Sequence, residues 1–544
     1  MLGILNGRVY DPANGVDGQV QDIWVQDGRI VAADQVPNRE AAEIFDAAGL
    51  VVMPGGVDIH SHIAGSKVNA GRRMCPEDHR ADTGAQNGVT RSGGGHSVPT
   101  TFATGYHYLE MGYTTVMEAA MPPLLARHTH EEMNDVPLLD KGAYTLMGNN
   151  RFLLGCLGHR QKAKARDFAA WLLEASRGYA IKIVNPGGVE NWKAGKRETD
   201  LDDPVLGWDA TPREIILALA DISTELGLPH GPHLHVNRLG QAGNASTTIR
   251  TIEALDGRRT HLAHLQFASY GGGGRHPLRS AAAEVAAAVN ANHNVTADIG
   301  QVVFGPTTTM TADGPLEHTL HQLSGSKWLN NDVEEETGGG VVPMNHARRN
   351  TVSALQWCIG MELFLSLEDP WRTFLTTDHP NGGPFTAYPE IIHCLMDREF
   401  RSQMLSSLPD KAQSRCGLAG LQREYSLQEI VIITRAGTAR ALGLANKGHL
   451  GVGADADIAV YAPQLNWSMM FRRARLVVKG GRVVVRDGQV VAVCPGHTLC
   501  VTPGWDEGIL PSLREHFEQH YTVGFDNYAV QDDYVPYCEV IRCK

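Results

Sequence analysis

The stretch over residues 51–63 constrains the fold of this chain more than any other. It reads Val-Val-Met-Pro-Gly-Gly-Val-Asp-Ile-His-Ser-His-Ile, an apolar run suited to a buried strand that leads to His60 and His62. Side chains alternate between the two faces of a strand, so these two imidazoles point the same way. Two imidazoles at the end of one strand can reach a single cation. The spacing alone is also typical of two polar residues at a strand exit, so its meaning depends on residues further along.

The middle of the chain alternates apolar, strand-like runs with helical stretches. Helical patterns cover 212–226 and 279–290, and the strand-like runs after the first are 114–118, 180–184, 231–236, 260–265 and 373–378. Such alternation is typical of repeated βα units around a parallel sheet. The pattern favours an α/β fold with a closed (β/α)₈ TIM barrel, and a doubly wound open sheet is the alternative.

Both ends of the chain have the same β-rich texture. Short runs at 7–10, 22–25 and 29–32 resemble those at 456–461, 474–478 and 482–485, with Asp-Gly and Gly-Gly pairs as hairpin signals. We expect the two ends to meet in one small β-sandwich. The predicted domains are 1–53 plus 431–499 for the composite sandwich, 54–430 for the barrel, and 500–544 for a C-terminal tail.

Two segments of the barrel region and the tail do not fit the βα repeat. The segments 64–110 and 304–350 are rich in Gly, Thr and Pro and too long for ordinary connections, so we predict inserted functional loops. The tail carries seven aromatic residues between Trp505 and Tyr537, which indicates docking on the chain's own body or on a partner.

Several of the predicted strands carry a group that can bind a metal or a proton. His60 and His62 end the first strand, Lys182 lies within another, and His235, His264 and Asp378 end later ones. All strand carboxyl ends of a parallel barrel open onto one face, where active sites lie. Imidazole and carboxylate together suit Zn²⁺ and related divalent ions. The sequence therefore predicts a metal site at this face.

Composition excludes some partners. The net charge of −12 disfavours nucleic acid and anionic membrane surfaces. No apolar run reaches membrane-spanning length, and the first residues lack the apolar core of a signal peptide. The nine cysteines form no CxxC pair, which is typical of free thiols in a reducing cytoplasm.

The motifs around these residues resemble the amidohydrolase superfamily, whose fold is a metal-bearing (β/α)₈ barrel with a β-sandwich. The resemblance spans about residues 1–495 and rests on 56–62, the strand lysine, the later histidines, 376–380, and the segments 438–444 and 453–457. The runs 301–315, 355–365 and 377–385 are similar to a narrower group, the alpha-type subunits of formylmethanofuran dehydrogenase and of the bacterial formyltransferase/hydrolase complex.

The resemblance implies roles for single residues. His60, His62, His235 and His264 would be ligands of two zinc ions, and Lys182 would be carboxylated and bridge them. Asp378 would be both a ligand and the general base that takes the proton of the attacking water and passes it to the leaving amine. His233 is an alternative ligand because it shares the strand face of His235.

The implied function is zinc-dependent hydrolysis of the N-formyl amide of a furan-type one-carbon carrier, formylmethanofuran or formylmethylofuran, to formate and the free amine. The chain would work with other subunits of a formyltransferase/hydrolase complex in one-carbon oxidation in methylotrophy. The alternatives are the corresponding subunit of a CO₂-reducing formylmethanofuran dehydrogenase, a stand-alone hydantoinase- or dihydroorotase-like enzyme, and a non-catalytic scaffold. The Ala-rich composition with more Arg than Lys leans toward the bacterial complex.

The sequence offers several candidates for the residues that contact the substrate. Asn294, His293 and Asn345 are candidates for the oxyanion donor by composition alone. The acidic tail that the family implies for the carrier would be bound by basic groups, for which the candidates are Arg72, Arg73, Arg275, Arg348 and Arg349.

Overall fold

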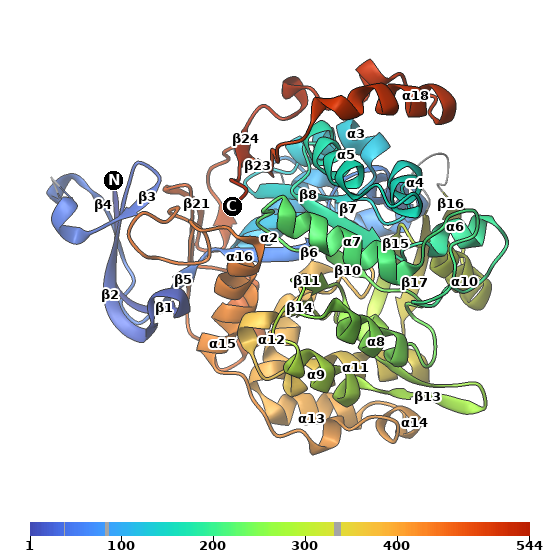
Figure 1. Cartoon of the computed structure of the whole chain (residues 1–544). Helices are drawn as coiled ribbons and strands as arrows, with labels where there is room; N and C mark the ends of the chain where they lie inside the picture. Colours follow the sequence, from blue (N-terminus) through green and yellow to red (C-terminus); the bar gives the residue numbers. More distant parts are fainter. Residues whose placement is uncertain (37–38, 82–85, 331–338) are drawn as a thin grey trace.

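A parallel barrel forms the centre of the molecule (Figure 1). The computed structural model describes residues 1–36, 39–81, 86–330 and 339–544. In these ranges eight parallel strands pair in chain order. They are β6 (Gly56–Ser61), β7 (Tyr113–Met121), β8 (Asp140–Leu146), β9 (Ala180–Val184), β10 (His233–His235), β11 (Thr260–Leu262), β14 (Val295–Asp298) and β18 (Thr373–Phe374). The predicted (β/α)₈ barrel is thus confirmed, and the open sheet is wrong.

The seam between the first and last strands closes just beyond their carboxyl ends. The backbone N–H of His62 donates to the carbonyl of His379 over 2.7 Å, and Ser61 and His379 form an isolated parallel bridge. This closure sits beside His60 and Asp378, so the same contact that closes the barrel brings the two ends of the predicted metal site together.

Helices surround the barrel. Those before β14 are α1 (Ser66–Met74), α2 (Thr101–Glu110), α3 (Ala126–Asp135), α4 (Arg151–Gly158), α5 (Lys162–Ala175), α6 (Gly188–Lys193), α7 (Pro212–Glu225), α8 (Ala245–Leu255) and α9 (Ala282–Ala291). Later ones are α11 (Thr351–Ser366), α12 (Tyr388–Met396), α13 (Arg398–Ser406), α14 (Asp410–Gln413), α15 (Leu427–Val431), α16 (Gly437–Leu442) and α17 (Trp467–Arg472). The start of α7 is fixed by a capping box between Thr211 and Glu214, followed by proline at the first helical position.

The strands of both chain ends belong to one sheet beside the barrel, at the left of Figure 1. Its nine described strands are β1 (Leu2–Asp11), β2 (Val16–Gln26), β3 (Arg29–Val31), β4 (Glu43–Asp46), β5 (Val51–Pro54), β19 (Ile458–Tyr461), β20 (Leu476–Lys479), β21 (Arg482–Arg486) and β22 (Gln489–Val490). The pair β5–β19 joins the two halves, and residues from both ends share one apolar core. Asp27-Gly28 and Asp487-Gly488 have positive φ at both positions, as tight hairpin turns require.

The two long inserted segments are not plain loops. The first contains α1 and α2, and the second contains β15 (Gly305–Thr311), α10 (Gly314–Ser324), β16 (Leu329–Asn330) and β17 (Gly340–His346). The strands β15, β17 and β16 form a small antiparallel sheet. Val68 and Val98 of the first segment pack on Met310 and Val341 of the second in a separate apolar cluster. The insertions therefore form one layer over the barrel.

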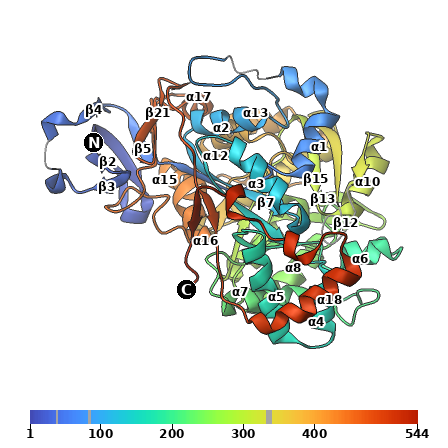
Figure 2. The same ribbon diagram turned by 90° about the horizontal axis from the view of Figure 1, so that it is seen from above.

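The C-terminal tail docks on the chain's own body (Figure 2). The strand β23 (Thr498–Cys500) pairs with the start of β8 and with β24 (Cys538–Val540). From α18 (Leu510–His520) and the segment after it, Phe517, Phe525 and Tyr528 surround Trp171 of α5. Within the described residues, no helix combines the length and apolar character needed to cross a membrane.

Candidate metal centre

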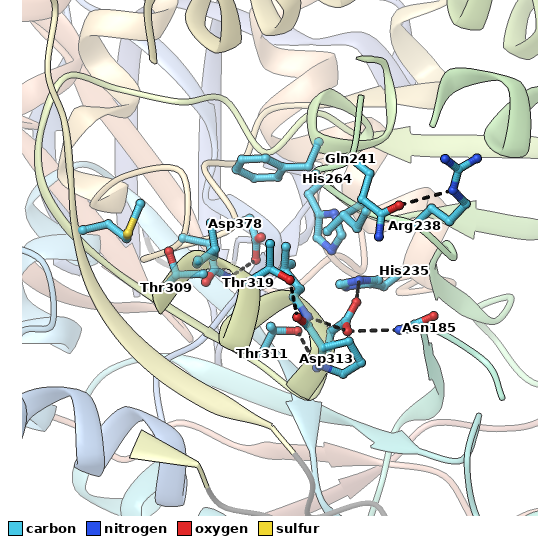
Figure 3. Close-up of a pocket in the computed structure, with 18 of the residues that line it drawn as sticks. Asn185, His235, Arg238, Gln241, His264, Thr309, Thr311, Asp313, Thr319 and Asp378 are labelled. Atoms are coloured by element: carbon cyan, nitrogen blue, oxygen red, sulfur yellow. Dashed lines mark hydrogen bonds and ion pairs between the residues drawn. The ribbon is translucent and has the colours of Figure 1, made fainter. Parts of the chain in front are cut away.

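A cavity of about 590 Å³ opens at the carboxyl ends of the barrel strands. Its walls come from the insertion around β15 and α10 and from the segments after β9 and β10 (Figure 3). All six residues predicted for the site line it, namely His60, His62, Lys182, His235, His264 and Asp378. The ends of distant strands therefore meet at one cavity, as predicted. The roles of the six residues stay predictions.

One side of the cluster joins the first strand to the last. Asp378 Oδ1 lies 2.9 Å from His60 Nε2 and 3.5 Å from His62 Nε2. On the far side of each ring, His60 Nδ1 lies 3.1 Å from Asp298 and His62 Nδ1 lies 3.1 Å from Glu118. A carboxylate behind an imidazole keeps the proton on the nitrogen that faces it and leaves the other nitrogen for a metal. Both Nε2 atoms thus face the same carboxylate.

The other side of the cluster contains His235 and His264, whose ring centroids are 4.8 Å apart. His264, two residues after the end of β11, has left-handed backbone angles, which turn its side chain toward the cavity. Its Nδ1 is buried with no hydrogen-bond partner among the described residues. Ligand atoms of His60, His264 and Asp378 all lie within 4.8 Å of one another. A buried ring nitrogen without a partner is costly unless something outside the chain occupies that position.

Lys182 is buried on the cavity floor with an exposed fraction of 2%. Burial lowers the pKa of its amine to about 8, even though Asp378, Asp298 and Glu118 act in the opposite direction. Asp378 shows the reverse balance: burial raises the pKa of its carboxyl, but His264 and His60 hold it well below the usual range. The site therefore combines an ionised carboxylate with a lysine that gives up its proton more readily than usual.

His233, the alternative ligand, faces away from the cavity. Its Nε2 lies 2.8 Å from His60 Nδ1, on the barrel-interior side of that ring, and 3.6 Å from Asp298. It does not line the cavity, whereas His235 does. His235 therefore faces the cavity and His233 does not, and the choice of His235 as the ligand stays a prediction.

Three carboxylates that hold the predicted ligands were missed from the sequence. Glu118 lies in the second half of β7 and Asp298 ends β14, and they lie behind His62 and His60. Asp313 begins α10, and its Oδ2 lies 3.1 Å from His235 Nε2 while its Oδ1 accepts from Asn185 (Figure 3). Glu118 could have been found because it ends a recognised strand run. Asp313 carries a helix-start signal, Asp-Gly-Pro, which by itself says nothing about its partner.

The candidates for substrate contacts need correction. His293 and Asn294 precede β14, so they lie at the opposite end of the barrel, and Asn294 donates to the carbonyl of Arg258. Asn345 does line the cavity. The described residues that line the cavity include none of the five arginines predicted to bind the carrier. One of these, Arg72, is buried against Glu132. The arginines that line the cavity are Arg197 and Arg238.

Comparisons with known proteins agree with this architecture. The Amidohydrolase family profile matches residues 43–492. Protein FwdA of Methanocaldococcus jannaschii is 48% identical, covering 99% of this chain and 98% of its own length. The A subunit of the formyltransferase/hydrolase complex Fhc of Methylorubrum extorquens is 42% identical, covering 98% of this chain and 97% of its own length.

A solved structure is similar over the full length. It is the formyltransferase/hydrolase complex FhcABCD from Methylorubrum extorquens with methylofuran, one chain of which matches with a TM-score of 0.94 and 40% identity, covering 100% of both chains. A D-hydantoinase from a Bacillus species matches with a TM-score of 0.50 and 14% identity over 93% of this chain and 100% of its own, which shows the fold alone. The chain belongs to the amidohydrolase family and, within it, to the group that contains FwdA and its Fhc counterpart.

Proposed function

We propose that this chain hydrolyses the N-formyl amide of a furan-type one-carbon carrier to formate and the free carrier amine, as the hydrolytic subunit of a formyltransferase/hydrolase complex. The observation that carries the proposal is the gathering of four imidazoles, one carboxylate and one lysine on the floor of one cavity. The full-length similarity to FwdA and to the Fhc relative supports the choice of substrate and partners. All nine cysteines are free, which fits a reducing cytoplasm as the compartment.

Two zinc ions fit the groups that the cavity presents. His60 and His62 would hold one ion and His235 and His264 the other, with Asp378 beside the first pair. The buried and unpartnered Nδ1 of His264 supports an occupant at this position. Buried histidine and carboxylate ligands are those that Zn²⁺ prefers. When bound, the ions would polarise the formyl carbonyl and make a water molecule more acidic.

Lys182 would bridge the two ions as a carbamate. An amine reacts with CO₂ only when neutral, and the pKa of about 8 leaves on the order of a tenth of this amine neutral at neutral pH. An unshifted lysine would have on the order of a thousandth or less in that form. Carboxylation turns the cationic side chain of Lys182 into an anionic one. A negative charge at this position would stabilise two neighbouring cations.

Asp378 would carry the proton in the reaction. Its Oδ1 accepts from Asn381 Nδ2 over 2.8 Å and faces His60 and His62, so its Oδ2 is the oxygen left for water. It would take the proton of the attacking water and deliver it to the carrier nitrogen. Protonation matters here because an amide nitrogen is a poor leaving group until it receives a proton.

The same site could form the amide in the opposite direction, as in a CO₂-reducing formylmethanofuran dehydrogenase. The observation that favours this second candidate is the higher identity to FwdA, 48% against 42% for the Fhc relative. A stand-alone cyclic amidohydrolase has weaker support. The similarity to dihydroorotase of Streptococcus pneumoniae, 56% identity, covers only 11% of the chain.

Purification of the full chain together with its companion subunits would test the proposal. We expect two zinc ions per chain by elemental analysis and release of formate from the N-formyl carrier. Hydantoin and dihydroorotate, offered as alternative substrates, should not be opened. A complex without bound metal, or one that opens these rings and leaves the formyl carrier intact, would contradict the proposed function.

A further inference from the structure

Asp298 is the point at which the predicted ligands from different strands are joined. It ends β14, is fully buried, and does not line the cavity. Its Oδ2 lies 3.1 Å from His60 Nδ1 and 3.0 Å from His261 Nε2. Its Oδ1 accepts from Thr376 Oγ1 over 2.6 Å and from the backbone N–H of His264 over 3.0 Å. One carboxylate thus receives donors from β6, from β11 and its end, and from the segment after β18.

We infer that Asp298 is the positioning residue of the metal centre: it holds the proton of His60 on Nδ1 and fixes the turn at His264, so that both rings present a bare nitrogen to the cations. The inference rests on the proposed metal site. Its physical basis is that an imidazole binds a metal only through a nitrogen without a proton, and the partner of the other nitrogen decides which one that is.

A second set of contacts requires the same proton position on His60. His230 Nδ1 lies 2.8 Å from the carbonyl of Ala441, which can only accept, so His230 carries its proton there. His230 Nε2 then accepts from His233 Nδ1 over 3.2 Å, which leaves His233 Nε2 as an acceptor. That atom lies 2.8 Å from His60 Nδ1. The chain of three rings therefore places the His60 proton on Nδ1, independently of Asp298.

This arrangement predicts an unusual order for two substitutions. In Asp298→Asn, the amide oxygen must stay at the Oδ1 position, because the backbone N–H of His264 can only donate. The new NH₂ group then faces His261 and His60. His261 can move its proton to Nδ1, 2.8 Å from the Thr296 hydroxyl, but His60 is held with its proton toward the amide. Asp298→Ala loses the acceptor but adds no opposing donor.

Binding of Co²⁺ and Zn²⁺ to the metal-free full-length chain, measured by chelator competition, tests the inference. We expect Asp298→Asn to raise the dissociation constant on the order of 100-fold and Asp298→Ala on the order of tenfold, the range found for partners of metal-binding histidines. A carboxylate that only fills space would give the opposite order, since asparagine matches its shape. Glu362→Gln is the control, because Glu362 is a buried carboxylate that accepts from Ser280 and Gly417 away from the cavity.

Several results would overturn the inference. They are unchanged metal affinity in Asp298→Asn, weaker binding by Asp298→Ala than by Asp298→Asn, or an equal loss in Glu362→Gln. If neither Asp298 variant folds, His233 provides the test: His233→Leu removes an acceptor of the His60 proton and should weaken binding several-fold, whereas His233→Gln keeps a carbonyl acceptor and should restore it. Equal affinities of these two variants would overturn it too. Absence of metal from the unmodified chain would instead contradict the proposed function.

Discussion

Replacing Asp378 with asparagine should separate metal binding from proton transfer. Three groups surround Oδ1 of this carboxylate: Asn381 Nδ2 at 2.8 Å, His60 Nε2 at 2.9 Å and His62 Nε2 at 3.5 Å. Asn381 itself cannot turn around, because its Oδ1 accepts from the backbone N–H of Met310 over 2.6 Å. The amide oxygen of Asp378→Asn must therefore occupy the Oδ1 position, and its NH₂ group replaces Oδ2. The oxygen beside the histidines is kept, and the proton acceptor is lost.

The expected loss follows from the role of a positioned acid–base group. Such a group contributes on the order of 10²- to 10⁴-fold to a rate, which corresponds to about 3–5 kcal/mol of transition-state stabilisation. We expect formate release by Asp378→Asn to fall by this factor, with the zinc content of the chain unchanged. The assay is formate production by the assembled complex, with elemental analysis of the same sample. Turnover within tenfold of the unmodified complex at full zinc content would refute the assignment of Asp378 as the base.

Three further predictions follow from other groups. The pKa of Lys182, about 8, means that its amine is mostly protonated below that pH, so regain of activity by metal-free protein supplied with zinc and bicarbonate should quicken up to about pH 8 and level off above it. Burial lowers the pKa of His130 to about 4, so the unfolded chain binds a proton that the folded chain does not. As the pH falls from about 6.5 to 4, His130 should therefore lower the free energy of unfolding by about 1.4 kcal/mol per pH unit. In urea unfolding at pH 7 and pH 5, the loss of stability at the lower pH should be smaller for His130→Gln than for the unmodified chain. Thr211→Ala removes the cap of α7 and should cost about 1 kcal/mol of unfolding free energy in urea, whereas Thr211→Ser should retain most of it.

The sequence was most informative where one residue type has one structural meaning. The hairpin pairs Asp27-Gly28 and Asp487-Gly488 are turns because positive φ is cheap for these residues. The apolar runs that end in histidine or aspartate could be recognised as barrel strands because the same pattern recurs along the chain. The strands β8 and β14 were missed: β8 begins Asp-Lys-Gly and lacks alternation, and β14 has only four residues after a polar His-Asn run.

Contacts between distant segments could not be predicted in the same way. The side chains predicted as ligands could be picked out because a strand end is a local feature, but their partners depend on which strand ends face each other. Asp298 reaches His60 across 238 positions in the chain, and no local pattern encodes such a pairing. The insertions were predicted as loops because Gly, Thr and Pro are common in them, yet the Thr-rich run of β15 pairs with β17. Threonine favours strands, so the pairing of β15 with β17 agrees with the local preference of the threonines in β15. The Gly and Pro content of the whole segment hid this preference.

The closure of the barrel beside the predicted metal site has a consequence for biosynthesis. His62 and His379 meet through a backbone hydrogen bond although more than half of the chain separates them. A growing chain presents its first two histidines early, but the carboxylate that completes their site emerges only with the last barrel strand. Cations taken up before that moment would meet an open rim that lacks the carboxylate of Asp378. For the proposed zinc site we therefore expect metal loading to be a late event, tied to completion of the barrel, and a chain truncated before residue 373 should retain no zinc.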